Sequence, residues 1–257
     1  MATSVLRYAV AAVTDLGRKR PTNEDAYGFS AEHGVYLVCD GMGGAAAGEV
    51  ASSVAVEVVL RQLSNRAWGD PVPLREVVEE AVRSANEAIH SRAQRSPQLN
   101  GMGTTLVGLM AEGPHVLVFN VGDSRCYRLH NLSMDPNRMN LSRLEQVTQD
   151  HSLVSEQVQM GRMTQDEALT SPLRNVITRA LGTQSTVLPD LYELEAEAGE
   201  IFLLCSDGLS GELTDPLMES MLAVDLPLED LCARLVNAAN IAGGHDNITC
   251  LLVRAES

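Results

Sequence analysis

Four aspartates lie at the ends of apolar runs that are typical of buried strands. They are Asp40 in VYLVCDGMGG, Asp123 in HVLVFNVGDSR, Asp207 in IFLLCSDGLSG and Asp246 in GGHDNITC. A single aspartate at a strand end is usually a turn former. Four of them, each beside a glycine or a loop, would meet at one rim of the core if their strands lie side by side.

Carboxylates that converge in this way repel one another and resist desolvation, so they need a cation in order to be ionised together. The sequence contains no HExxH motif and no cysteine cluster, which disfavours zinc. Oxygen ligands suit Mg²⁺ or Mn²⁺. Two such ions can share a carboxylate and activate a water molecule for attack on a phosphoryl group.

A second polar cluster lies in GRKRPTNEDAYG, residues 17–28, and contains Arg20, Glu24 and Asp25. One interpretation is a solvated turn after the first strand. The functional alternative is that Arg20 binds a phosphate through two parallel hydrogen bonds. Glu24 and Asp25 would then hold water molecules of the metal site.

The glycines after Asp40 suggest a rival function. GMGGAA, residues 41–46, matches the G-x-G-x-x-A fingerprint of dinucleotide-binding proteins. That fold requires a second strand ending in an acid roughly 20 residues further on. Here a helix is predicted to continue to about residue 63, no strand is predicted before residue 104, and no GK[ST] follows. The pattern therefore disfavours a nucleotide site.

The predicted elements do not alternate as β-α-β units. Strands are expected at residues 8–13, 35–39, 104–110, 115–121, 125–130, 144–148, 190–197, 201–205 and 247–253. Helices are expected at residues 45–63, 74–95, 215–222 and 228–241, with short helical pieces within 151–182 and a long connection at 131–143. This order favours mainly antiparallel sheets with helices packed outside them.

Composition limits the possible partners and location. The 257 residues carry a formal net charge of −15, which makes nucleic acid and membrane surfaces poor partners. The five cysteines are odd in number and show no CxxC spacing, as expected in a reducing compartment. No apolar stretch reaches the roughly 18 residues of a membrane span, so we expect a cytoplasmic protein.

Eight motifs together resemble the PPM-type, metal-dependent protein phosphatases (the protein phosphatase 2C-like family) in their compact bacterial form. They occur in the family's order across nearly the whole chain. They are RPTNED (20–25), DGMGG (40–44), GMGTTL (101–106), VGDSRCYRL (121–129), QDHS (149–152), SPLRNVITRALG (171–182), CSDGLSGEL (205–213) and GGHDNIT (243–249).

The resemblance implies an α+β fold, a four-layer α/β/β/α sandwich of two mainly antiparallel sheets with a binuclear metal site at one end. Residues 1–257 would form a single catalytic domain, with a flap subdomain at about 153–180.

The resemblance also implies the roles of individual residues around two Mn²⁺ or Mg²⁺ ions. The implied ligands are Asp40 as the bridge, the Gly41 carbonyl, Asp207, Asp246, Glu24 through water with Asp25 beside it, and Asp123 with Asp207 for a third ion. Arg20 would bind the substrate phosphate, and Asn247 would have a structural role beside Asp246.

Three positions bear on the parts that the resemblance leaves open. Many eukaryotic relatives carry a histidine, the proposed general acid, where this chain has Met42, and a thioether cannot donate a proton. A metal-bound water is the first candidate for that role and His151 a weaker one, with a structural role the alternative for His151. Asn175 replaces a serine that some relatives have near the third metal.

The implied activity is hydrolysis of phosphoserine and phosphothreonine in proteins by a metal-bridging water, opposing a eukaryotic-like bacterial Ser/Thr kinase. A phosphatase of a small metabolite and a catalytically silent binding module on the same fold are the alternatives. The expected partners are phosphorylated proteins and such a kinase, and the expected state is a monomer.

Overall fold

Two β-sheets form the centre of the protein, seen in a computed structural model that describes residues 6–66, 71–131 and 142–257. The first sheet has the strand order β1-β11-β10-β7-β8. Its strands are β1 (Arg7–Asp15), β11 (Ile248–Glu256), β10 (Ile201–Cys205), β7 (Arg125–Asn131) and β8 (Ser142–Gln146). Each neighbouring pair in this sheet is antiparallel.

The second sheet has the order β2-β3-β5-β6-β9, and the short strand β4 pairs with β3. Its strands are β2 (Asp25–Ser30), β3 (Val35–Met42), β4 (Gly103–Thr104), β5 (Leu106–Glu112), β6 (His115–Val121) and β9 (Asp190–Glu195). These pairs are antiparallel as well.

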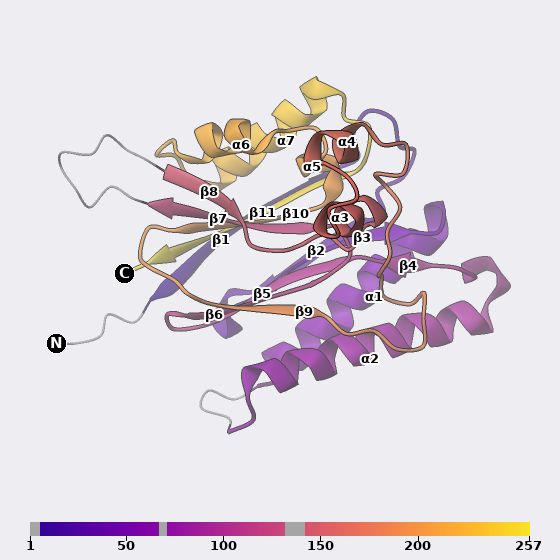
Figure 1. Ribbon diagram of the computed structural model, residues 1–257. Helices are drawn as coiled ribbons and strands as arrows, with labels where there is room; N and C mark the ends of the chain where they lie inside the picture. Colours follow the sequence, from indigo (N-terminus) through magenta and orange to yellow (C-terminus); the bar gives the residue numbers. More distant parts are fainter. Residues whose placement is uncertain (1–5, 67–70, 132–141) are drawn as a thin grey trace.

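Helices cover the outer face of each sheet, which gives four layers (Figure 1). The second sheet is covered by α1 (Ala45–Ser64) and α2 (Leu74–Arg95), and the first by α6 (Asp215–Leu222) and α7 (Leu228–Ala242), after the short α5 (Asp207–Ser210). Single 3₁₀ turns occur at η1 (Ala31–His33) and η2 (Pro97–Leu99). The predicted fold class is confirmed.

The alternation of side chains along β3 places the first acid of the predicted site. Val35, Leu37 and Cys39 pack into the core under α1. Tyr36 and Val38 pack into the core between the two sheets. Because side chains alternate along a strand, Asp40 points into the space between the sheets, at the rim where the apolar core ends.

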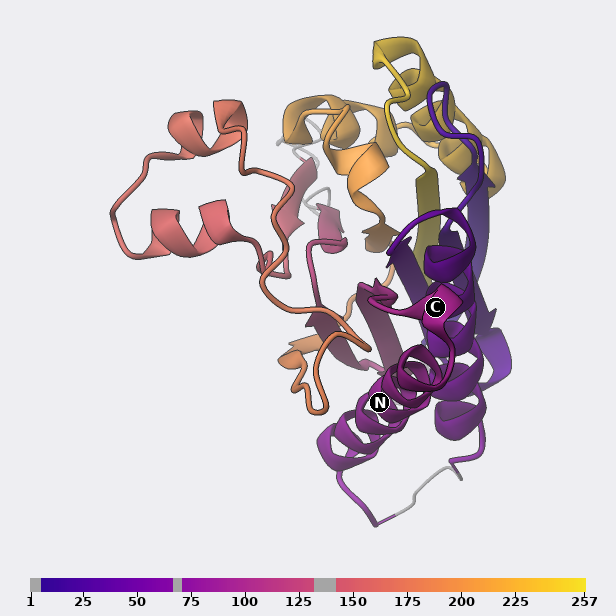
Figure 2. The same ribbon diagram turned by 90° about the vertical axis from the view of Figure 1, so that its right-hand side faces the viewer.

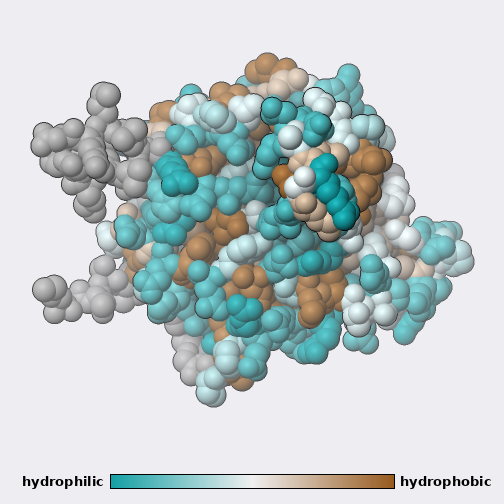
Figure 3. Space-filling view, viewed as in Figure 1, coloured by the Kyte–Doolittle hydropathy of each residue, from teal (hydrophilic) through white to brown (hydrophobic). Residues whose placement is uncertain are grey.

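Two helices stand apart from the four layers. α3 (Leu153–Gln159) and α4 (Gln165–Thr170) project from the body on one side (Figure 2). Hydrophilic residues dominate the face in Figure 3, with hydrophobic residues in small groups between them. Within the described ranges, no helix is both long and apolar enough to cross a lipid bilayer.

Several element boundaries differ from the sequence prediction. β2 was missed, because residues 17–28 were interpreted as a turn, and α5 was missed as well. The strand expected at 104–110 is two strands, β4 and β5, interrupted at Thr105. The strand expected at 144–148 is β8, which begins and ends two residues earlier. Most of the predicted connection at 131–143 lies outside the described residues.

Candidate active site

Asp25 and Asp40 lie directly opposite each other in the antiparallel pair β2–β3. Like charges at such positions destabilise a sheet. Ser206 and Thr249 reach across from the other sheet, and each hydroxyl donates a hydrogen bond to Asp25 Oδ2 at 2.7 Å. The other carboxyl oxygen of Asp25 is buried and has no hydrogen-bond partner. The two sheets are thus joined at the rim through an acid.

The backbone of Asp40 is fixed by two threonines from the loop around β4. Thr104 Oγ1 and Thr105 N both donate hydrogen bonds to the Asp40 carbonyl oxygen at 2.8 Å. Asp40 N donates in turn to Thr105 Oγ1 at 2.9 Å. Ser124 Oγ lies 2.7 Å from Thr105 Oγ1, so the position of Asp40 is coupled to the turn that carries Asp123.

Asp123 and Asp207 approach the same region from different elements: Asp123 lies in the turn between β6 and β7, which joins the two sheets, and Asp207 follows β10 of the first sheet. Asp207 is the first residue of α5, two residues after the end of β10, and its Oδ1 is buried without a hydrogen-bond partner. Asp123 is 8% exposed and follows Gly122, whose φ of 109° is available to glycine but not to other residues without strain. The tight turn therefore aims a buried carboxylate at the rim.

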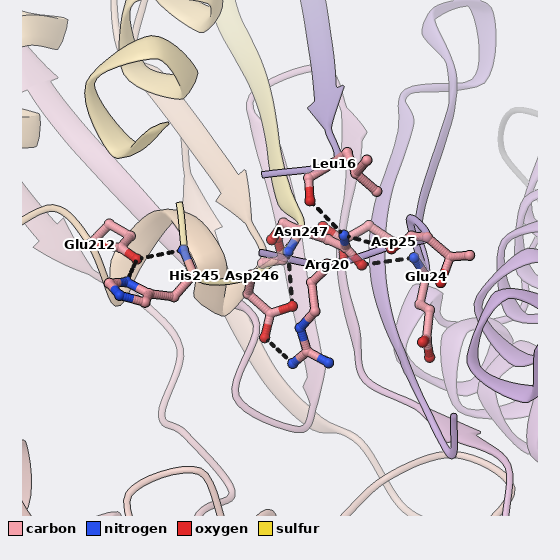
Figure 4. A network of polar contacts seen from close by, with 10 residues as sticks. Leu16, Arg20, Glu24, Asp25, Glu212, His245, Asp246 and Asn247 are labelled. Atoms are coloured by element: carbon pink, nitrogen blue, oxygen red, sulfur yellow. Dashed lines mark hydrogen bonds and ion pairs between the residues drawn. The ribbon is translucent and has the colours of Figure 1, made fainter. Parts of the chain in front are cut away.

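Asp246 forms an ion pair with Arg20, with 2.6 Å between Nη2 and Oδ2 (Figure 4). Asn247 connects this pair to Glu24 by accepting a hydrogen bond from Glu24 N at 2.8 Å. Its amide nitrogen donates to the carbonyl oxygens of Leu16 and Thr22 at 3.0 Å. One buried amide therefore holds the loop that carries Arg20 and Glu24 in place.

The glycines after Asp40 permit a close approach of backbone segments. A Cβ on Gly41 would lie 2.2 Å from Gly48 O and 2.6 Å from Glu24 O. A Cβ on Gly48 would collide with the Glu24 carboxylate. β3 is followed by two helices before the next strand begins. These contacts explain the glycines by packing, and the order of elements is not that of a dinucleotide-binding unit.

The carboxyl groups of the cluster are hard to ionise together. Burial and the negative charges of Asp207 and Asp246 raise the pKa of Asp25 to about 7. Burial and Asp207 likewise raise the pKa of Asp123 to about 7. Burial followed by Asp25 raises the pKa of Asp40 well above its usual range, and burial followed by Asp246 raises that of Asp207. A bound cation would reverse these shifts.

The donor set fits hard divalent cations, because all the donors are oxygens and two buried carboxylate oxygens lack partners. Among the described residues, no three acidic, histidine or cysteine side chains are already arranged to hold an ion. Instead, Arg20 engages Asp246. A divalent cation that took Asp246 as a ligand would compete with Arg20 for that carboxylate.

The contacts of His151 indicate a structural role. It is 6% exposed, and its Nδ1 accepts a hydrogen bond from Gly122 N at 3.0 Å. Its Nε2 lies 3.1 Å from Asp190 Oδ2 without the alignment of a hydrogen bond. Burial lowers the pKa of His151. A buried imidazole held between the Asp123 turn and β9 is not placed to protonate a leaving group.

Met42 and Asn175 lie in different surroundings from the acidic cluster. Met42 pairs with Gly103, and its Cε lies 2.9 Å from where a Cβ of that glycine would be. Met42 therefore packs over β4. Asn175 lies in an exposed turn between α4 and β9. Neither position supplies an acid to the cluster.

Sequence reasoning missed most of the side chains that position the acids. Thr104, Thr105, Ser124, Ser206 and Thr249 all lie within or beside the quoted motifs, but no role was predicted for them. The signal was present as hydroxyl residues next to the aspartates. Their partners depend on strand register, which those motifs do not specify.

Comparisons with known proteins agree with this geometry. The family model for protein phosphatase 2C matches residues 18–252. The serine/threonine phosphatase stp of Listeria monocytogenes is 36% identical over 252 residues, covering 95% of this chain and 94% of that protein. PstP of Mycobacterium tuberculosis, a serine/threonine protein phosphatase, is 38% identical over 97% of this chain and 45% of its own length.

Solved structures share the fold. The catalytic domain of PstP in complex with two manganese ions has a TM-score of 0.85 and 34% identity, covering 98% of this chain and all of that one. Stp1 from Staphylococcus aureus has a TM-score of 0.87 and 31% identity, covering 96% and 95%. These matches confirm the predicted enzyme class and, at the level of the family, the predicted manganese dependence. The chain belongs to the protein phosphatase 2C family.

Proposed function

We propose that the protein hydrolyses phosphoserine and phosphothreonine monoesters in proteins with the help of two Mn²⁺ or Mg²⁺ ions. The observation that carries this proposal is the cluster of buried carboxylates with unpartnered oxygens at Asp25 and Asp207, directly beside the Arg20 guanidinium. Ions bound there would neutralise charge on the phosphoryl group and activate a water for its attack. The serine/threonine phosphatases among the relatives support the substrate class.

The residues that would hold the ions come from five segments around the rim. Asp40 would be shared by both ions, and the Gly41 carbonyl, Asp207 and Asp246 would each hold one of them. Glu24 would act through water with Asp25 beside it, and Asp123 with Asp207 would hold a third ion.

Arg20 has two partners in this proposal. It is bound to Asp246 in the structure, and its guanidinium is half exposed. With Asp246 engaged as an ion ligand, the planar guanidinium of Arg20 would be free to bind two oxygens of the phosphoryl group. Arg20→Ala should therefore raise the KM for a phosphopeptide at least tenfold while the affinity for Mn²⁺ stays within a few-fold. A large loss of Mn²⁺ affinity would contradict the phosphate role.

The leaving hydroxyl of the substrate receives its proton from water in this proposal. Met42 has no proton to give, and His151 is buried between Gly122 and Asp190. Solvent water at the rim is therefore the proposed source of the proton.

The cellular setting of the enzyme is also part of the proposal. A bacterial Ser/Thr protein kinase and its phosphorylated targets are the partners, and the protein acts in the cytoplasm as a monomer. The strongly negative net charge, −15 by sequence, supports protein substrates over nucleic acid or an anionic membrane surface.

The decisive experiment measures phosphate release from a phosphothreonine peptide, from p-nitrophenyl phosphate and from sugar phosphates. Each substrate is tested in Mn²⁺ and again with a chelator. We expect turnover of the first two in Mn²⁺ only, with the peptide favoured. Preference for a sugar phosphate would indicate a metabolite phosphatase. Absence of turnover with every substrate, in protein that binds Mn²⁺, would indicate a silent binding module.

A further inference from the structure

Two cations beside the active site form no ion pair with a described residue, although the charge of Arg18 helps to lower the pKa of the nearby Asp15. Both Arg18 and Lys19 are exposed. They precede Arg20 directly, and RKR is the only run of three basic residues in the sequence. Lys19 is also the only lysine among the 257 residues. In a chain with 34 acids and 19 bases, this concentration of positive charge requires an explanation.

The turn that carries these cations is held firmly against the site. Gly17 N donates a hydrogen bond to Asp15 Oδ1 at 2.8 Å, and Arg18 N donates to Gly244 O at 2.7 Å. Gly17 has φ +77°, and a Cβ there would lie 2.1 Å from Asp246 O. The turn is therefore packed on the segment that contains Asp246, and the backbone that carries Arg18 is fixed beside it.

Ion pairs hold the side chains of several other arginines. Arg61, Arg75 and Arg83 are exposed, and each pairs with a glutamate at 4 Å or less. The partly exposed Arg179 pairs with Asp190. Arg18 instead packs its aliphatic stem along Gly244, with Cγ 2.8 Å from where a Cβ would be. The stem is anchored, and the exposed charged group interacts with Asp15 through space without forming an ion pair.

Charge is distributed unevenly around the site. Arg18, Lys19 and Arg20 lie on the side of the β1–β2 connection. On the side of α1, the exposed Glu49 adds negative charge next to Glu24. A phosphorylated segment bound at Arg20 would therefore meet a positive surface in one direction and a negative one in the other.

We propose that Arg18 and Lys19 form a substrate-selecting rim that favours phosphosites flanked by acidic residues or by a second phosphate. This inference rests on the proposed phosphatase activity and specifies its substrate class. Unpaired, exposed cations fixed near a phosphate site attract anionic ligands through space and discriminate against cationic ones. Without this rim, the net negative charge of the protein disfavours acidic peptides.

The test measures the hydrolysis of two phosphothreonine peptides by the 257-residue chain in Mn²⁺. One peptide has aspartates on both sides of the phosphothreonine, and the other has asparagines at the same positions. We expect kcat/KM to favour the acidic peptide by about three- to tenfold at low ionic strength, with a smaller ratio at higher salt. Arg18→Gln/Lys19→Gln should reduce the ratio to about one, and Arg18→Glu/Lys19→Glu should invert it.

The matched control is Arg7→Gln/Arg143→Gln, which removes the same charge from two exposed residues. Arg7 begins β1 and Arg143 lies near the start of β8, at the end of the molecule remote from α3 and the rim (Figure 1). This variant should keep the wild-type ratio. All variants should turn over p-nitrophenyl phosphate as the wild type does, because that substrate has no flanking residues.

An active enzyme whose peptide ratio is the same in the wild type and in Arg18→Gln/Lys19→Gln would overturn the inference and leave the proposed function intact. The same holds if Arg7→Gln/Arg143→Gln lowers the ratio equally, because net charge would then be the cause. A wild-type protein that hydrolyses neither peptide nor p-nitrophenyl phosphate would overturn the proposed function and this inference with it.

Discussion

Two regions of the molecule bury a carboxylate, and their surroundings are opposite in sign. Glu200 is 4% exposed, accepts hydrogen bonds from Arg128 Nε at 3.0 Å and Nη2 at 2.6 Å, and lies 3.0 Å from His130 Nδ1. At the rim, Asp25 and Asp40 are surrounded mostly by further carboxylates. A buried acid among cations holds the fold together, whereas buried acids among acids indicate a place for a cation.

The largest effect should come from the shared ligand of the acidic cluster. Asp40→Asn should reduce Mn²⁺-dependent turnover of p-nitrophenyl phosphate by roughly 10³-fold, because the amide removes the negative charge that both ions need. Thermal unfolding in a chelator should show no loss of stability, because the substitution also removes repulsion from Asp25. Asp225→Asn, an exposed change of the same charge, is the control. Wild-type turnover in Asp40→Asn would refute the metal assignment.

Substitution of Glu200, in the other of the two regions, should lower stability and hardly change activity. Glu200→Gln leaves Arg128 and His130 without their shared anion and should cost about 3 kcal/mol of unfolding free energy. Denaturant unfolding measures this cost, and turnover per folded molecule should stay unchanged. Glu145→Gln, which removes the exposed carboxylate on the other side of His130, should change stability by less than about 0.5 kcal/mol. Equal losses in both variants would contradict the importance of burial.

The pH dependence of stability should show the same contrast. The folded-state pKa of Asp25 is about 7, against 3.8 in an unfolded chain, so the folded protein holds this proton more tightly. Its contribution to stability is complete below about pH 4 and is lost as the pH rises through 7, by at most about 1.4 kcal/mol per pH unit. In a chelator, wild-type unfolding free energy should therefore fall relative to Asp25→Asn between pH 5 and 7.

Saturating Mn²⁺ tests the origin of that slope. A bound cation favours the ionised carboxylates, so the difference between wild type and Asp25→Asn should no longer grow in the same direction with pH. A pH slope that is identical in both proteins without metal would show that Asp25 titrates normally, and the electrostatic contrast between the two regions would then be wrong.

Four aspartates of the cluster could be predicted from the sequence, because Asp40, Asp123 and Asp207 lie at the ends of strongly apolar runs and Asp246 lies just before one. It did not predict that Asp25 faces Asp40, since β2 was taken as a turn. DAYGFS is a half-buried edge strand with a glycine, and such strands give a weak hydrophobic pattern. Nor could register be inferred, although it decides that Ser206 and Thr249 meet Asp25.

The smallest effect concerns His151, which resembles His130 in lying beside a carboxylate. Its buried imidazole accepts from Gly122 N and faces Asp190, just as His130 faces Glu200. His151→Gln can keep an acceptor for Gly122, so kcat should stay within about threefold and stability should fall by about 1 kcal/mol. The pH profile of kcat should keep its shape. A general acid would instead lose roughly 10²- to 10⁴-fold in kcat, with a changed alkaline limb, and that result would move His151 from the structural group into the catalytic one.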